Sequence, residues 1–331
     1  MVRTLEPGAF AVVMATGIVS TAMHAQHLAG VSAALLWITG FVYAFLVVGH
    51  IARIALFPSD VRDDLTDPER SFTMFTFVAG TNVLGARLLL DGHVGPAVGL
   101  FVVGLVAWLV LGYVIPWTAV LGHPDGPTLS RVNGTWFLAV VAAQSVAVLA
   151  AGLQPVLHGH QRALALLAVL CWSVGAVLYA AAGILVAVRI LLYPVGAREL
   201  TPPYWIAMGA TAITVFAGAR IVQMVDTPLV ESVRGLIGGI SVVFFGFGTW
   251  LIPVLIAAGV WRHLIRRVPL RYTTALWSIV FPLGMYGVAG HYLGLADRIP
   301  ALTAFGDAEG WVALAAWVAT LLFVICARKS L

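Results

Sequence analysis

The sequence predicts an all-α integral membrane protein that crosses the bilayer ten times. Of its 331 residues, 61% are hydrophobic and only 10% are charged, whereas a soluble domain carries about 25% charged residues. The mean hydropathy is +1.00, and the 34 glycines and 11 tryptophans fit a bilayer, where Gly is tolerated and Trp gathers at the interfaces. These observations exclude a soluble enzyme, a nucleic-acid binder and a disordered chain.

Ten apolar runs are long enough to span the hydrocarbon core, which takes a helix of about 20 residues. Only Arg3 precedes the first run, and polar residues interrupt it, so we expect a retained helix there and not a cleaved signal. The loops are short, and the longest, from Pro58 to Arg70, holds only a small charged turn, so we expect a single domain over 1–331. The expected helices are 7–27, 31–57, 71–90, 94–121, 132–153, 163–190, 204–223, 232–261, 272–294 and 309–327.

The positions of Lys and Arg predict the topology. With both termini on one side, that side receives 13 of the 18 Lys and Arg residues and the other side receives 5. Cytoplasmic loops carry an excess of these residues, so we expect a multi-pass protein of the plasma (inner) membrane with cytoplasmic N- and C-termini. The net charge of +4 is then a topology signal, and no nucleic-acid partner is expected.

A fivefold repeat runs through the odd-numbered helices of this series. Each begins near an aromatic residue, at Phe10, Phe72, Trp136, Trp205 and Trp277. The odd helices hold 19 Ser, Thr, Asn and Gln residues and the even ones hold 8. Polar side chains avoid lipid, so we expect five helical hairpins in a quasi-five-fold arrangement around a central pore. The polar and small residues expected to line it are Thr16, Gly17, Gln144, Ser145, Thr211 and Thr214.

The charges predict what such a pore would carry. No Asp, Glu or Lys falls in the middle of an expected span, which disfavours a cation pump or a carboxylate proton relay. A neutral polar lining with arginines near helix ends suits anions better. Arg87 and Arg220 lie near the non-cytoplasmic ends of two odd helices. These two arginines either form an anion vestibule or snorkel, so that their guanidinium groups reach the interface. Snorkelling is the favoured interpretation.

Histidines support a rival function of a different class. His24, His50 and His291 lie in or near spans, and paired intramembrane histidines can ligate haem in an electron-transfer subunit. Their positions suggest no facing pair, and Cys171 and Cys326 indicate neither a disulfide nor a metal cluster. We therefore expect no cofactor, no metal and no enzymatic activity.

Pro282 marks the strongest irregularity in the ninth span, with Gly284 shortly after it. A proline frees a carbonyl one turn earlier and kinks the helix, so we expect the kink at the lining. Phe281 precedes the proline and is the side chain best placed to be aimed into the lumen as a gate. The alternative is that Phe281 simply packs.

Three segments resemble one family. LEPGAFAVVMATGIVS, VNGTWFLAVVAAQSVAVLAA and WSIVFPLGMYG are similar to the first, fifth and ninth helices of the tellurite-resistance/dicarboxylate-transporter family. Its members include TehA-type channels, slow anion channels of plant guard cells, malate permeases and sulfite efflux pumps.

The resemblance implies transport of small inorganic or organic anions, such as chloride and nitrate or a C4-dicarboxylate such as malate. It also implies a homotrimer with one pore per protomer, plugged by a phenylalanine that maps onto Phe281. A proton-coupled C4-dicarboxylate carrier and a sulfite or tellurite exporter remain alternatives.

Overall fold

The protein contains ten helices that are long and apolar enough to cross a membrane, among the residues that this computed structural model describes, 2–121, 128–224 and 227–329. Nine of them match the predicted spans to within four residues at each end. The helices are α1 (Ala11–Ala25), α2 (Ala29–Leu56), α4 (Phe75–Leu90), α5 (Val94–Ile115), α6 (Leu138–Leu153), α7 (Gln161–Leu192), α8 (Ile206–Val222), α9 (Pro228–Val260), α10 (Trp277–Ala296) and α11 (Pro300–Lys329).

The helices divide into a central and a peripheral set. The central helices α1, α4, α6, α8 and α10 contact one another in a closed cycle, since α10 packs back against α1. The peripheral helices α2, α5, α7, α9 and α11 each pack mainly on the central helix that precedes them in the chain. The protein buries 61–94% of the apolar windows of the central helices but only 17–44% of those of the peripheral helices. The odd-numbered predicted spans are therefore mostly buried inside the protein, and the even-numbered spans are mostly exposed on its outside.

Each central helix starts with a short 3-10 turn, which repeats five times along the chain. The repeated aromatic residues fall in these turns or directly after them. Proline favours such starts because its missing N–H would be unpaired there anyway, and Asn133 caps one of them by accepting a hydrogen bond from the Thr135 N–H at 2.8 Å. The turns are Pro7–Phe10, Ser71–Met74, Gly134–Phe137, Pro202–Trp205 and Thr274–Leu276.

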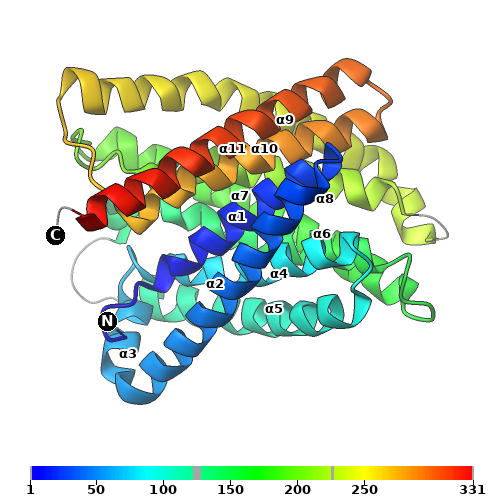
Figure 1. Ribbon diagram of the computed structural model, residues 1–331, viewed down its shortest axis with the longest axis horizontal. Helices are drawn as coiled ribbons and strands as arrows, with labels where there is room; N and C mark the ends of the chain where they lie inside the picture. The colour runs from blue at the N-terminus through cyan, green and yellow to red at the C-terminus, as the bar shows by residue number, and fades with distance from the viewer. Residues whose placement is uncertain (1, 122–127, 225–226, 330–331) are drawn as a thin grey trace.

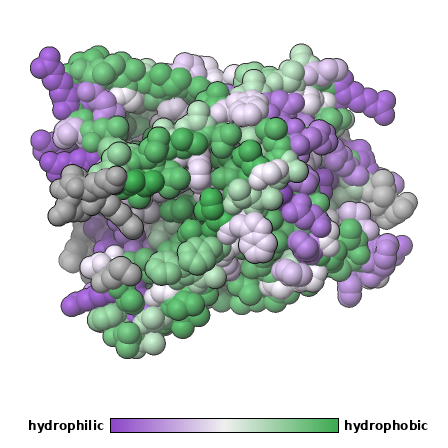
Figure 2. Space-filling model, in the orientation of Figure 1, coloured by the Kyte–Doolittle hydropathy of each residue, from purple (hydrophilic) through white to green (hydrophobic). Residues whose placement is uncertain are grey.

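The bundle has two polar ends and an apolar middle. The start of the chain and the end of α11 lie at the same end, which we call the termini face, and the short turns that join each central helix to its peripheral partner lie at the other, the hairpin face (Figure 1). Figure 2 shows apolar side chains over the middle of the visible surface and hydrophilic ones at both ends. This is the pattern of a protein that spans a bilayer.

The last helix begins nine residues earlier than predicted, at Pro300. The charged and Pro/Gly-containing segment before 309 breaks the apolar run in the sequence, which places the expected start of the span at 309. In the structure these glycines let α10 and α11 approach closely: a Cβ at Gly287 would lie 2.9 Å from the Gly310 nitrogen, as in small-residue helix contacts in membranes. Asp307, which the sequence placed outside the last span, and Glu309 therefore both lie in the first third of α11, a helix long and apolar enough to span the membrane.

Candidate functional site

A cavity of about 710 Å³ opens at the termini face among the first turns of all five central helices. Its deepest contributors from these helices are Ala11, Thr76, Leu138, Ile206 and Ser278. Because each central helix supplies residues from its first turns, this cavity lies on the central axis of the bundle, at the end where the termini are.

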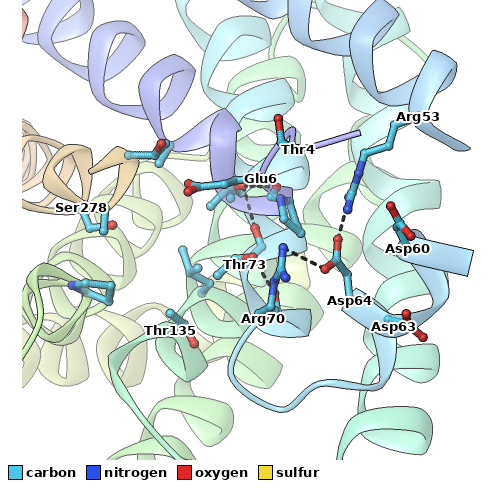
Figure 3. A pocket seen from close by; sticks show the side chains of 18 of the residues that line it. Thr4, Glu6, Arg53, Asp60, Asp63, Asp64, Arg70, Thr73, Thr135 and Ser278 are labelled. Carbon is cyan, nitrogen blue, oxygen red and sulfur yellow. Dashed lines mark hydrogen bonds and ion pairs between the residues drawn. The ribbon is translucent and has the colours of Figure 1, made fainter. Parts of the chain in front are cut away.

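The mouth of this cavity carries both signs of charge (Figure 3). The short helix α3 (Pro58–Thr66) forms where the sequence predicted a charged turn. Its Asp64 is buried and bridges Arg53, at 2.6 Å, and Arg70, at 2.9 Å. Since Glu6, Asp60 and Asp63 also line the mouth, this end does not favour anions by charge.

The chain start is tied to α3 by an exposed ion pair. Arg3 Nε donates to the Asp60 carboxylate at 2.7 Å. This hydrogen bond, with the charge of the guanidinium, holds the pKa of the Asp60 carboxyl below its usual range. Together with Arg53 and Asp64, the pair fixes α3 beside the cavity mouth.

A second cavity, of about 290 Å³, lies toward the hairpin face and is again lined by all five central helices. Arg220 is the only charged side chain that lines it among the described residues. The guanidinium lies over the ring of Tyr292, 5.7 Å from the centroid, and no carboxylate of the described residues pairs with it. The rest of the lining is mostly apolar, with Asn82, Ser145 and Thr21 as polar members. A cation in a low-dielectric cavity attracts anions strongly.

Two helical turns separate the cavities on every central helix. On α10, Ser278 is the last residue at the first cavity and Met285 is the first at the second, and the other four helices show gaps of six or seven residues. At 1.5 Å per residue this barrier is about 10 Å thick. Phe281 lies three residues after Ser278 and four before Met285, on the same face of the helix, and is 1% exposed. The corresponding residues of the other helices are Met14, Ala79, Val141 and Gly209, so Phe281 is the only aromatic residue of this set.

Pro282 and Gly284 do not line either cavity. The ring of Pro282 packs against Gly209 of α8, and Gly284 lies against Ile18 of α1, where an added Cβ would be 2.8 Å from Ile18 Cγ2. The kink residues thus shape the contacts of α10 with its neighbours. Phe281 also lines neither cavity, and its helical spacing from Ser278 and Met285 puts it at the level of the barrier.

Most of the polar residues expected at the lining lie elsewhere. Thr16 accepts a hydrogen bond from Trp317 of α11 at 3.0 Å, and Gln144 donates to the Trp172 carbonyl of α7 at 3.1 Å. Both side chains face peripheral helices, because a central helix has an outer contact face as well as an inner one.

Three more of the expected residues, Gly17, Thr211 and Thr214, line neither cavity. Thr211 lies against Gly248 of α9, Gly17 lies against Val83 of α4, and the Thr214 hydroxyl donates to the Ala210 carbonyl of its own helix. Of the predicted polar lining only Ser145 borders a cavity, where it accepts a hydrogen bond from Asn82 at 3.0 Å.

Arg87 is buried and does not snorkel. Its exposure is 2%, Nε donates to Ser20 at 3.0 Å, Nη2 donates to Ser32 at 2.7 Å, and Nη1 lies 2.9 Å from the Asp91 carboxylate. The side chain joins α1, α2 and α4 and does not line either cavity. The favoured snorkelling interpretation is therefore corrected for Arg87, and of the two arginines only Arg220 borders a cavity.

The three membrane histidines lie on three different helices with separate partners. His24 Nδ1 is 3.7 Å from Asp91, His50 Nδ1 is 2.9 Å from the Leu46 carbonyl, and His291 Nδ1 is 2.8 Å from Asp307. In the described part of the chain, no group of three His, Cys, Asp or Glu residues is placed to hold a metal ion.

Sequence reasoning missed Asp64 at the mouth and Tyr292 below Arg220. Tyr292 follows Ser278 and Met285 at seven-residue steps, so the spacing on α10 carried a signal for it. The four-residue spacing of Arg87 and Asp91 was likewise an ion-pair signal. Nothing in the sequence pairs Asp64 with Arg53, because the pairing depends on how α3 folds back.

Comparisons with known proteins find similarity to a family and to three membrane or transport proteins. Residues 4–325 match the sequence model of the family described as "Voltage-dependent anion channel". Over 148 residues, 45% of this chain and 75% of the relative, the chain is 57% identical to an uncharacterized membrane protein of Mycobacterium tuberculosis, in both strain H37Rv and strain CDC 1551. An uncharacterized transporter of Methanocaldococcus jannaschii is 22% identical over 98% of this chain and 95% of its own length.

Proposed function

Since this chain belongs to the voltage-dependent anion channel family, we propose that it passes small anions along the two cavities enclosed by its five central helices. Membership implies transport of anions across a membrane and not catalysis. The observation that supports this path best is the hairpin-face cavity, whose only charged lining side chain among the described residues is Arg220. Such a cavity attracts anions and repels cations.

The proposal places a quasi-five-fold pore inside one single-domain protomer. The closed cycle of central helices, each with its own peripheral partner, supports five repeated hairpins around one axis. We further propose a homotrimer in the plasma membrane, as the family resemblance implies. In this proposal the termini face is cytoplasmic, because the predicted topology assigns 13 of the 18 Lys and Arg residues to the side of the termini.

Phe281 is the proposed gate. It lies in the barrier between the cavities and is 1% exposed. An apolar ring in a narrow lumen excludes water, so an ion loses hydration without compensation, and hydrophobic constrictions close pores in this way. Pro282 restricts the backbone of the residue before it, which fixes the direction of the ring.

A direct test reconstitutes the purified protein in liposomes and measures the reversal potential in a potassium chloride gradient. We expect a value close to the equilibrium potential of chloride. A reversal potential close to that of potassium would contradict the proposal.

One observation favours a proton-coupled C4-dicarboxylate carrier as a second candidate. His291 and Asp307 form an intramembrane pair at 2.8 Å, and His291 packs against Tyr292, which lines the hairpin-face cavity. Ionisable groups inside a membrane often serve transport. Flux that saturates with malate and follows an imposed pH gradient would establish this candidate in place of the channel.

A further inference from the structure

A deep apolar groove of about 940 Å³ runs along the outside of the bundle between α7 and α9. Its walls are residues 179–191 of α7 and 247–260 of α9, and Trp205 of the turn before α8 and Ala207 of α8 also line it. At 1.5 Å per residue the walls are about 18–20 Å long, a little more than half the thickness of a hydrocarbon core. The groove therefore matches the depth of one leaflet.

This groove ends at the termini face in another cavity, which is rich in arginines and has a volume of about 1230 Å³. Arg262, His263 and Tyr204 line both spaces, so the groove and the cavity are continuous. An occupant with apolar tails and an anionic head could fill the two together.

Three arginines of the cavity carry positive charge that no carboxylate of the described residues neutralises. Arg189 pairs with Glu199 at 2.9 Å, and Arg70 pairs with Asp64. Arg262 instead donates to three backbone carbonyls, those of Ala197, Arg198 and Leu200, and its Nε is buried without a hydrogen-bond partner. The other two unpaired arginines are Arg198 and Arg271, both exposed.

We propose that this groove and cavity form a binding site for one anionic phospholipid, with acyl chains between α7 and α9 and the phosphate near Arg198, Arg262 and Arg271. An excess of arginines on one face is enough to set topology, but topology does not require them to converge on the end of a leaflet-deep apolar groove. Basic pockets between membrane helices at the interface are suited to anionic headgroups. A second copy of the chain would cover the groove and leave the guanidinium groups without anionic partners.

This site is independent of the proposed function and is tested by binding. The full-length protein is placed in nanodiscs of phosphatidylglycerol or phosphatidylcholine, and the lipid retained is counted by native mass spectrometry. We expect one tightly held phosphatidylglycerol per chain and no equivalent phosphatidylcholine. The double variant R198Q/R271Q should bind phosphatidylglycerol roughly 10- to 30-fold more weakly, since each basic residue near an anionic lipid contributes about a factor of five.

Two further variants separate the parts of the site. R162Q/R298Q removes two arginines near the hairpin face, neither of which lines the groove or the cavity, and should retain the lipid. Gly183→Phe fills the groove from a position where an added Cβ meets no atom within 4 Å, so it should fold and lose the lipid.

Four results would overturn the proposal. The first is equal retention of the two lipids, and the second is unchanged phosphatidylglycerol binding in R198Q/R271Q. The third is competition by inorganic phosphate as effective as competition by lipid. The fourth is a change of oligomeric state in Gly183→Phe without loss of lipid, which would identify a second copy as the occupant.

Discussion

The ring of Pro282 in α10 lies directly against Gly209 in α8: a Cβ at Gly209 would come within 2.9 Å of Pro282 Cγ and 3.2 Å of Pro282 Cα. The contact joins two central helices at the level of the barrier, next to Phe281. Part of it is backbone, which cannot rotate away from an added methyl group.

Gly209→Ala should therefore push α10 away from α8. We expect a loss of stability of about 1–3 kcal/mol, as for overpacking, and a raised basal anion flux, because Phe281 moves with Pro282. Melting temperature and liposome flux measure the two effects. The matched control is Gly183→Ala, where an added Cβ meets nothing within 4 Å. Since Ala has a higher helix propensity than Gly, this variant should be more stable than wild type by about 0.5–1 kcal/mol. Equal melting temperatures for the two variants would contradict the packing argument.

Replacing Phe281 tests the gate. Phe281→Ala should admit water into the barrier and raise basal flux, and Phe281→Leu should do so less, because Leu fills more of the space. If Phe281 only packs, Phe281→Ala loses about 3–5 kcal/mol through the cavity it leaves and gains no conductance. Flux and melting temperature measured on the same preparation separate the two roles. Wild-type flux in well-folded Phe281→Ala protein would contradict the proposed gating role of Phe281.

Arg87→Gln should lower stability and leave conductance per folded protein unchanged. The guanidinium bonds Ser20, Ser32 and Asp91 across three helices, and losing hydrogen bonds to a charged group costs about 1.5–3 kcal/mol. Reduced chloride flux in folded Arg87→Gln protein at unchanged melting temperature would show instead that this residue acts on the permeating ion.

Asp64→Asn should destabilise the termini face strongly. It leaves Arg53 buried beside a neutral partner, and breaking a buried ion pair from one side costs about 3–5 kcal/mol. Asp63→Asn removes the same charge from an exposed neighbour on α3 and should change stability by less than about 0.5 kcal/mol. Thermal unfolding of both variants makes the comparison, and similar melting temperatures would mean that the Asp64 bridge contributes little.

The membrane spans could be predicted because each is a long apolar run whose length the bilayer dictates. The direction of a polar side chain on a central helix could not, as Thr16 and Gln144 show, because both faces of such a helix are buried. Arg87 looked like an interfacial side chain from its position alone, and its burial depends on serines from two other helices. The sequence predicts the start of α11 nine residues too late, because Asp307 and Gly306 interrupt the apolar run; in the structure Gly306 is instead a close helix contact with α10.

The most direct test of anion passage through the hairpin-face cavity is the chloride flux of Arg220→Gln in liposomes at low and at high salt. Arg162→Gln is the matched control, because it removes an exposed arginine near the same face that lines neither central cavity. We predict that Arg220→Gln lowers chloride flux, most at low salt where charges are least screened, and that Arg162→Gln behaves as wild type. Folded Arg220→Gln protein with wild-type chloride flux at low salt would contradict the account.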